Sequence, residues 1–327
     1  MALKRRLARF AAPVERAVDR VRRRPTTAQI IAPYAGYATP THLVVRGRVL
    51  GKATTSTVAA GQGRLRNLYQ MIRLFLTDEV ADVMIRHGDY SVQSDEEGYF
   101  TLLVPRDDRT GWVDVTVEAG PLTATCPVLI PDPDAEFGVI SDIDDTMMPT
   151  GAYSLWRNIW TSLTGNALTR NVFPDAVTLM DLLHEGGRNP IYFVSSSPWN
   201  LHGFLDQVFD RHGLPKAPKF LRDYGISDTQ FITGTHGDHK GSAIDRIMAA
   251  NPDLSFVLIG DTGQHDAQVY LDAVGRHPGR VRQVILRTAG HEDAADKAAF
   301  AALQETAVPV HAGPTYDGVI ADLRPRS

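Results

Sequence analysis

The first part of the chain, residues 30–130, alternates hydrophobic and polar positions with a period of two. Val113, Val115 and Val117 are separated by polar residues, and a similar alternation runs through residues 122–130. Because successive side chains of a strand point to opposite faces, this pattern predicts strands with one buried face. The spacing is therefore typical of a small β domain.

Two further strands are predicted over residues 43–50 and 99–104, and one interruption has helical spacing. Leu and Ile recur at steps of three or four over residues 64–76, which predicts a helix. The sequence Pro131-Asp132-Pro133-Asp134 then breaks the pattern. We therefore predict a small β-sandwich domain with one inserted helix over residues 25–133.

Beyond residue 134, short apolar runs alternate with helical stretches, which predicts a parallel sheet with helices on both faces. The strands are expected over residues 137–141, 190–195, 230–233, 256–260 and 281–286, and the helices near residues 175–184, 199–210, 241–250 and 266–274. Residues 134–327 thus form a predicted α/β domain. Ligands of such sheets lie at the carboxyl ends of the strands.

The composition of the 327 residues agrees with a globular chain of two domains, since 43% are hydrophobic and 22% are charged. No apolar run approaches the roughly 18 residues of a membrane-spanning helix. The single Cys126 excludes an internal disulfide and a thiolate metal site. We therefore expect a protein of a reducing compartment, the cytoplasm.

The charge is distributed unevenly. Residues 1–24 hold nine Lys and Arg against two acidic residues, a net charge of +7, so the rest of the chain carries −11 of the total of −4. Their hydrophobic residues also recur at helical spacing, which predicts a basic amphipathic helix. This helix either docks on the body of the protein or binds an anionic membrane surface, in which case the protein is peripheral at the inner membrane surface. No nucleic-acid-binding motif accompanies these arginines, so no nucleic acid is expected.

Carboxylates gather where two of the predicted strands end. The first strand runs into Asp142-Ile143-Asp144-Asp145-Thr146, and the fourth into Gly260-Asp261, with Asp266 five residues later. Such carboxylates repel one another unless a cation lies between them. Oxygen ligands without nitrogen or sulfur favour Mg²⁺, which we expect as the cofactor.

Residues suited to phosphate binding occupy two further positions along the same edge. The second strand ends in Ser195-Ser196-Ser197-Pro198, and Lys240 begins the helix before the fourth strand. Alone, Ser197 would be interpreted as a helix cap and Lys240 as a surface charge. The order Asp142, Ser195, Lys240 and Asp261 along the chain, each where a strand meets a helix, favours a catalytic site instead.

These residues resemble the four motifs of the haloacid-dehalogenase superfamily of phosphatases, namely Asp142-x-Asp144-x-Thr146, Ser195, Lys240 and Gly260-Asp261-x4-Asp266. The longer strings DIDDTMMPTGA, YFVSSSPWNL, HKGSAIDRI and LIGDTGQHDAQVY look like the catalytic domain of the actin-patch-associated type of phosphatidate phosphatase. The resemblance spans about residues 136–290. It implies a Rossmann-like sheet of the haloacid-dehalogenase type.

The resemblance also implies a role for each matching residue. Asp142 would attack phosphorus to form an aspartyl-phosphate, and Asp144 would act as general acid and base. Lys240 would stabilise the phosphoryl charge, and either Ser195 or Ser196 would bind a phosphoryl oxygen. The implied Mg²⁺ ligands are Asp142, Asp261, the backbone carbonyl of Asp144 and, more weakly, Asp266; the candidates for substrate contact are Thr146, Ser196 and Trp199.

The expected activity is hydrolysis of phosphatidate to diacylglycerol and phosphate at a membrane surface. Two alternatives remain: a phosphatase for soluble phosphomonoesters, and a non-catalytic lipid-binding adaptor. A nucleophile together with an acid argues against the adaptor. Residues 147–172, which include Trp156 and Trp160, would cover the site as a flap, with the tryptophans either packed in the core or in contact with acyl chains.

Overall fold

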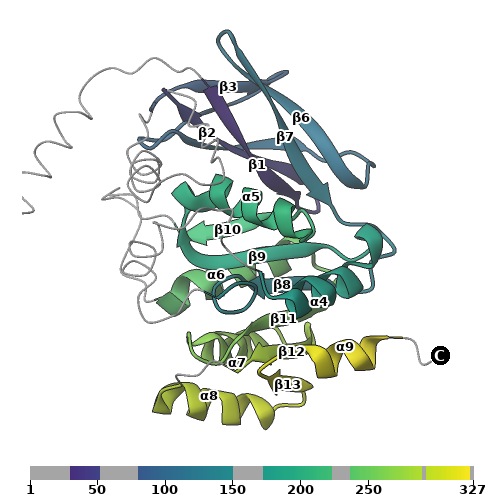
Figure 1. Cartoon of the computed structure of the whole chain (residues 1–327). Coiled ribbons are helices and arrows are strands. Elements are labelled where there is room, and N and C mark those ends of the chain that lie inside the picture. The colour runs from purple at the N-terminus through teal and green to yellow at the C-terminus, as the bar shows by residue number, and fades with distance from the viewer. Residues whose placement is uncertain (1–29, 52–79, 150–171, 223–235, 289–291, 325–327) are drawn as a thin grey trace, which may run out of the picture.

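The computed structural model describes residues 30–51, 80–149, 172–222, 236–288 and 292–324 (Figure 1). The helices predicted over residues 1–24 and 64–76, the strand over 230–233 and most of the flap lie outside the described residues. The described strands form two sheets. A seven-stranded sheet precedes residue 131, and a six-stranded sheet begins at residue 138.

The seven-stranded sheet has the order β4-β3-β6-β7-β1-β2-β5. Its neighbours are antiparallel except β1 and β7, which are parallel. The edge strands β4 and β5 also contact each other, so one continuous sheet folds over a shared core. The strands are β1 (Ile30–Ala38), β2 (His42–Leu50), β3 (Met84–His87), β4 (Tyr90–Gln93), β5 (Tyr99–Pro105), β6 (Gly111–Ala119) and β7 (Leu122–Ile130).

Strand β6 confirms the alternation seen in the sequence. Val113, Val115 and Val117 are buried, and the residues between them are exposed. The valines pack in the core of the folded sheet, because a strand places every second side chain on the same face. The period of two therefore predicted which face of the β domain is buried.

The second sheet is entirely parallel and has the order β10-β9-β8-β11-β12-β13. Four predicted strands are confirmed, although β9 runs three residues further than expected. Edge strands β10 and β13 were not predicted, because four residues are too few to show a period. The strands are β8 (Gly138–Asp142), β9 (Ile191–Pro198), β10 (Lys219–Arg222), β11 (Phe256–Asp261), β12 (Val281–Arg287) and β13 (Val310–Gly313).

Helices cover both faces of this sheet, as predicted. Helices α4 (Pro174–His184), α5 (His202–His212) and α9 (Asp317–Leu323) pack on one face with Val139 of β8. The next residue, Ile140, packs on the other face with α6 (His236–Ala250), α7 (Asp266–Arg276) and α8 (Ala294–Gln304). Single helical turns of the 3₁₀ type, η3 (Glu185–Gly187) and η4 (Trp199–Leu201), follow α4 and β9.

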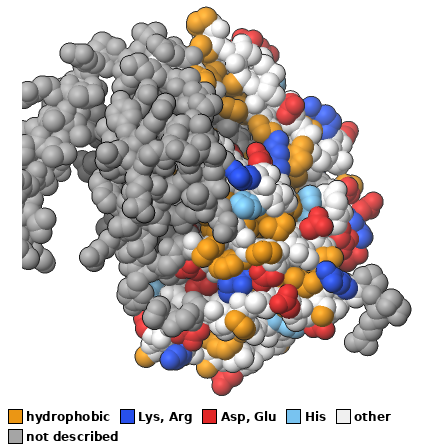
Figure 2. All heavy atoms as spheres, viewed as in Figure 1, with side chains coloured by type: hydrophobic (Ala, Val, Ile, Leu, Met, Phe, Trp, Pro, Cys, Tyr) orange, Lys and Arg blue, Asp and Glu red, His pale blue; other side chains and the backbone are white. Residues whose placement is uncertain are grey.

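The two sheets share part of one core. Tyr37, Val44 and Leu129 of the first sheet pack with Phe220 of β10, and β1 and β2 lie beside β10 and α5 (Figure 1). On the face shown in Figure 2, acidic, basic and hydrophobic side chains of the described residues are interspersed. Within the described part of the chain, no helix is long and apolar enough to cross a membrane.

Candidate active site

The turn after β8 places two buried carboxylates at the carboxyl edge of the parallel sheet. Asp142 is 2% exposed and Asp144 is 5% exposed. The backbone amides of Met147 and Met148 donate to the carbonyl of Ile143, which closes the turn. Asp145 occupies the left-handed region at φ +55°, a conformation that Asp adopts more readily than most residues. Such a tight turn keeps both carboxylates beside the neighbouring strand ends.

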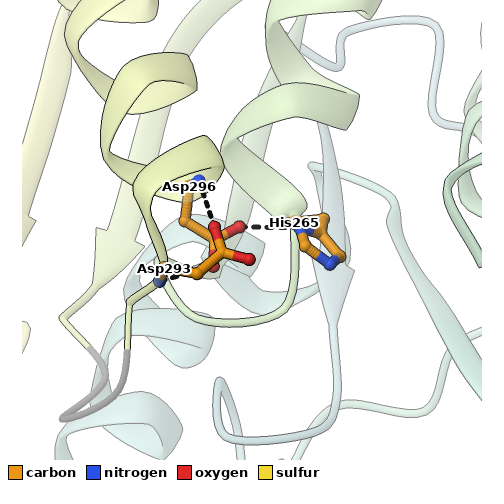
Figure 3. Close-up of side chains that lie close together, drawn as sticks. All are labelled: His265, Asp293 and Asp296. Carbon is orange, nitrogen blue, oxygen red and sulfur yellow. Dashed lines mark hydrogen bonds and ion pairs between the residues drawn. The ribbon is translucent and has the colours of Figure 1, made fainter.

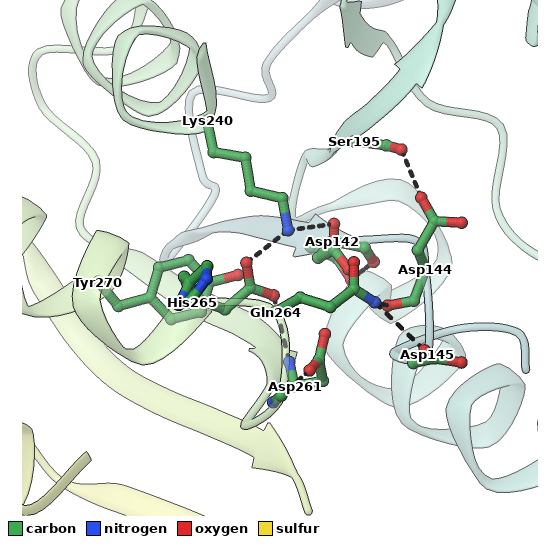
Figure 4. Close-up of polar contacts among 12 residues, drawn as sticks. Asp142, Asp144, Asp145, Ser195, Lys240, Asp261, Gln264, His265 and Tyr270 are labelled. Carbon is green, nitrogen blue, oxygen red and sulfur yellow. Dashed lines mark hydrogen bonds and ion pairs between the residues drawn. The ribbon is translucent and has the colours of Figure 1, made fainter. Parts of the chain in front are cut away.

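Lys240 of α6 joins the end of β8 to the start of α7 through its ammonium group. Its Nζ lies 2.8 Å from Asp142 Oδ1 and 2.5 Å from Asp266 Oδ1 (Figure 4). Burial alone would lower the pKa of Lys240, but the carboxylates of Asp142 and Asp266 outweigh burial and raise the pKa well above its usual range. The ammonium is therefore charged, and it is buried within the site rather than on the surface.

Two serines of β9 hold the carboxylate of Asp144. Ser195 Oγ donates to Asp144 Oδ2 at 2.8 Å, and Ser197 Oγ donates to the same oxygen at 3.1 Å. Burial raises the pKa of Asp144, and the hydrogen bonds from both serines partly oppose that rise. A raised pKa suits a carboxyl group that has to carry a proton near neutrality.

Ser197 is a site residue that the sequence did not reveal. The short predicted strand made Ser197 a helix cap, whereas β9 continues to Pro198 and places its hydroxyl in the site. Ser195 and Ser197 are buried and Ser196 is half-buried, as expected for neighbours on opposite faces of a strand. Of the two serines expected to bind phosphate, Ser195 is thus the one whose hydroxyl bonds to Asp144.

Three carboxylates of the site converge closely enough to share a cation. Asp142, Asp261 and Asp266 each offer an oxygen, and these oxygens lie within 4.8 Å of one another. Asp142 Oδ2 and Asp261 Oδ2 are buried and accept no hydrogen bond from the described residues. Asp266 differs, because its Oδ1 pairs with Lys240 and its Oδ2 accepts from the backbone amide of Asp261 at 3.2 Å.

The pKa shifts report the same crowding of charge. Burial and then Asp266 raise the pKa of Asp261 to about 8. Burial also raises the pKa of Asp142, even though Lys240 acts to lower it. The positive charge of the Lys240 ammonium therefore does not neutralise the negative charges of Asp142, Asp261 and Asp266. Buried oxygens without hydrogen-bond partners and an all-oxygen donor set fit Mg²⁺.

Gly260 leaves the space that Asp266 occupies. A Cβ atom at Gly260 would lie 2.6 Å from Asp266 Oδ2 and 2.8 Å from the hydroxyl of Tyr270. That hydroxyl donates to the carbonyl of Ile259 at 2.7 Å, which fixes α7 against β11. The close packing of Asp266 and Tyr270 therefore requires glycine at position 260, immediately before Asp261.

Gln264 is a second site residue that the sequence did not single out. Its Nε2 donates to the carbonyl of Asp144 at 3.0 Å and to Asp145 Oδ2 at 3.3 Å. These bonds tie the loop after β11 to the turn after β8 (Figure 4). Its position between Asp261 and Asp266 was the available signal, but sequence spacing does not show which turn a side chain reaches.

Thr146 and Trp199 contact residues outside the carboxylate cluster. Thr146 is buried, and its carbonyl lies 3.4 Å from both Arg287 Nε and the hydroxyl of Tyr316, contacts that anchor the turn. Trp199 stacks on Tyr34 of β1 with ring centroids 5.3 Å apart. Their contact with substrate remains a prediction.

A second cluster is made of His265, Asp293 and Asp296 (Figure 3), and its His265 lies among the site residues in Figure 4. His265 Nδ1 is 2.7 Å from Asp296 Oδ1. Asp293 caps α8 by accepting from the amides of Ala295 and Asp296, and the amide of Asp293 donates back to Asp296. The cluster is thus a helix cap that also fastens the loop before α7.

The fold and the site define an α/β domain with an acidic, lysine-containing centre at the carboxyl ends of its parallel strands. Residues 137–288 match the family model described as "Phosphatidate phosphatase APP1, catalytic domain". This part of the chain is therefore similar to the catalytic domain of phosphatidate phosphatase APP1, which confirms the resemblance of the longer strings to the actin-patch-associated type of phosphatidate phosphatase.

Two fungal proteins are similar to the chain over longer segments. Phosphatidate phosphatase APP1 of Saccharomyces cerevisiae is 27% identical over 200 residues, covering 59% of this chain and 34% of the yeast protein. An uncharacterized protein of Schizosaccharomyces pombe is 25% identical over 248 residues, covering 71% of this chain and 40% of its own length. The matched region thus spans between a third and two fifths of these relatives.

Similarity to solved structures is weaker. A chain from "Structure of Pnkp1/Rnl/Hen1 complex" aligns with a TM-score of 0.33 and 10% identity, covering 52% of this chain and 55% of that one. A TM-score this low supports no conclusion about fold or function.

Proposed function

We propose that the chain is a Mg²⁺-dependent phosphatase of the haloacid-dehalogenase type that hydrolyses phosphatidate to diacylglycerol and phosphate. The observation that carries this proposal is the convergence of Asp142, Asp144, Ser195 and Lys240 with Asp261 at one sheet edge. The similarity of residues 137–288 to a phosphatidate phosphatase catalytic domain supports the choice of substrate.

In the first step, a carboxylate oxygen of Asp142 attacks phosphorus and the bond from phosphorus to the glycerol oxygen breaks. Asp144 gives its proton to the departing alkoxide, so diacylglycerol leaves as a neutral alcohol. The product is an aspartyl-phosphate on Asp142. The raised pKa of Asp144 supports this role, because the group has to be protonated at the start.

In the second step, Asp144, now a carboxylate, takes a proton from water as the water oxygen attacks phosphorus. The bond between phosphorus and Asp142 breaks, which restores the carboxylate and releases inorganic phosphate. The hydroxyl of Ser195 binds a phosphoryl oxygen, and the Lys240 ammonium balances the charge on the transferring group.

Asp142 and Asp261 would hold the cation, together with the carbonyl of Asp144. When bound, Mg²⁺ would offset the negative charge that the anionic nucleophile and the dianionic phosphate bring together. Asp266 would contribute mainly by holding Lys240 and the Asp261 amide, since both of its oxygens already have partners.

The expected place of action is the cytoplasmic surface of a membrane, where phosphatidate resides. Residues 1–24, with their net charge of +7, would attract the enzyme to anionic lipid. A truncated variant that lacks residues 1–24 should lose activity on phosphatidate vesicles and keep activity on a soluble ester. Equal loss on both substrates would instead assign these residues a structural role.

The nucleophile is tested by phosphate release from phosphatidate vesicles with Mg²⁺ or with EDTA. Asp142→Asn should lower the rate by about a thousandfold or more, and Asp144→Asn by about a hundredfold or more. Asp210→Asn is the matched control, because Asp210 is exposed on α5. An active Asp142→Asn variant would refute the proposed nucleophile. Faster hydrolysis of soluble phosphomonoesters than of phosphatidate would refute the proposed substrate.

A further inference from the structure

The segment that follows the site serines lies against the β domain. Trp199 and His202 of this segment stack with Tyr34 of β1, with ring centroids 5.3 Å and 4.2 Å from the tyrosine ring. The rings of Trp199 and His202 are also nearly parallel, with 10° between their planes and 5.7 Å between their centroids. Aromatic pairs at these distances favour a fixed relative orientation. The β domain thus packs directly on the turn that leaves β9.

A polar contact joins the same two parts of the chain. Asn200 Oδ1 accepts from Arg48 Nη1 and from the hydroxyl of Tyr99, both at 3.0 Å. Arg48 is 2% exposed, and its Nε also donates to the carbonyl of Glu97 at 2.8 Å. One amide oxygen of the catalytic domain therefore receives two donors from strands β2 and β5.

A buried cation reinforces this contact from β2. The guanidinium of Arg46 lies 5.3 Å from the ring centroid of Trp199, 4.9 Å from that of Phe220 and 5.2 Å from that of Tyr37. A cation over aromatic faces in a buried place is held more strongly than at the surface. Strand β2 therefore contacts both η4, which follows β9, and the edge strand β10.

Only two residues separate Ser197 from Asn200. Ser197 donates its hydroxyl to Asp144, and its amide donates to Ser195 Oγ at 2.9 Å. The intervening Pro198 has a restricted backbone, with φ −69° and ψ 151°. A displacement of Asn200 therefore reaches the two hydroxyls on Asp144 through a short and stiff stretch of chain.

We propose that Asn200 is a positioning residue, through which the β domain fixes the end of β9 that carries Ser195 and Ser197. This inference rests on the proposed phosphatase function, in which Ser195 binds phosphate. Loss of the contact with Arg48 and Tyr99 lets the serines move relative to Asp144. A misplacement of about 1 Å at a catalytic group costs on the order of a hundredfold in rate.

The first test compares two substitutions at one position. Asn200→Leu keeps the approximate shape and removes the acceptor, whereas Asn200→Asp keeps an acceptor for both donors. Lys216→Met is the matched control, because Lys216 lies 4.4 Å over Trp112 at another contact of the β domain with the catalytic domain. All variants are studied as full chains, with kcat and KM for p-nitrophenyl phosphate, Ki for orthovanadate and the melting temperature.

We expect Asn200→Leu to lower kcat about 10- to 100-fold and to raise the Ki for orthovanadate about tenfold. In Asn200→Asp, kcat and the Ki for orthovanadate should stay within about threefold of the wild-type values. In Lys216→Met both values should be unchanged. A merely structural contact would lower the melting temperature without this rescue. Equal losses in Asn200→Asp and Asn200→Leu, or unchanged kinetics in Asn200→Leu, would overturn the inference.

A second measurement separates the inference from the proposed chemistry. Amide hydrogen exchange should become faster over residues 195–202 in Asn200→Leu and stay unchanged over residues 138–141 of β8. This result would support positioning even if the wild-type chain released no phosphate, an outcome that would refute only the proposed function. Unchanged exchange over residues 195–202 would refute the positioning role whatever the activity.

Discussion

A methyl group added at Gly260 should disturb the packing at the edge of the site. The new Cβ would meet Asp266 Oδ2 at 2.6 Å and the Tyr270 hydroxyl at 2.8 Å, where real Cβ contacts are essentially never below 3.0 Å. Both groups are buried, and both hold partners: Asp266 binds Lys240, and Tyr270 binds the carbonyl of Ile259. Neither group can move without losing a hydrogen bond.

Overpacking of this kind costs about 1–3 kcal/mol in folding stability. For a domain of this size, that loss lowers the melting temperature of Gly260→Ala by about 3–10 °C. The displacement of Asp266 also moves the Lys240 ammonium, so phosphate release should fall about 10- to 100-fold. Differential scanning fluorimetry and a phosphate-release assay measure the two effects.

Gly275→Ala is the control, because Gly275 lies in α7 and an added Cβ meets no atom within 4 Å. Alanine in a helix should stabilise the protein by about 0.5–1 kcal/mol and leave the activity unchanged. If Gly260→Ala matched Gly275→Ala in melting temperature and in rate, the close packing of Asp266 and Tyr270 on β11 would be wrong.

Three further outcomes follow from the charges and hydrogen bonds of the site. Lys240→Met leaves Asp142 without its cation, so this variant should lose measurable activity. Its free energy of unfolding at pH 7, measured in urea, should fall by about 3 kcal/mol or more. An unchanged urea midpoint would contradict the buried ion pair of Lys240 and Asp142. Because the pKa of Asp261 rises from 3.8 to about 8 in the folded protein, a proton on Asp261 would compete below pH 8 with the proposed binding of Mg²⁺. The increase in melting temperature on replacing EDTA with Mg²⁺ should therefore be larger at pH 8 than at pH 6, and a constant increase would refute the competition. Ser197→Ala should lower kcat/KM several-fold, about the 1 kcal/mol of one hydrogen bond to Asp144, with Ser197→Thr as the variant that keeps the hydroxyl; equal rates for the two would contradict that bond.

Periodicity predicted the strands and the buried faces because each is a local property of the chain. Val113 and its neighbours show their buried face by alternation, and the apolar runs at β8 and β11 show strands covered on both sides. The four-residue strand β10 lacked such a signal. Its place in the sheet depends on pairing with β9, which no local pattern encodes.

The candidate site was predictable as far as strand ends define it. Asp142, Asp144, Ser195, Lys240 and Asp261 do come together, because parallel strands bring their carboxyl ends to one edge. The directions in which the side chains of the site point could not be predicted from the sequence.

The roles of Ser197 and Gln264 could be seen only in the structure. The first depends on β9 continuing to Pro198, and the second on the Gln264 amide reaching the turn after β8. The stacking of Trp199 on Tyr34 joins residues 165 positions apart, and neither residue lies in a pattern that specifies its partner.

The place of β10 has a consequence for solubility. It is an edge strand of the described parallel sheet, and Phe220 on it is covered by Tyr37 and Arg46 of the β domain. An uncovered edge with exposed aromatic side chains is a template for pairing between molecules. The α/β domain, expressed without the β domain, should therefore aggregate, so the two domains are expected to fold and stay soluble only together.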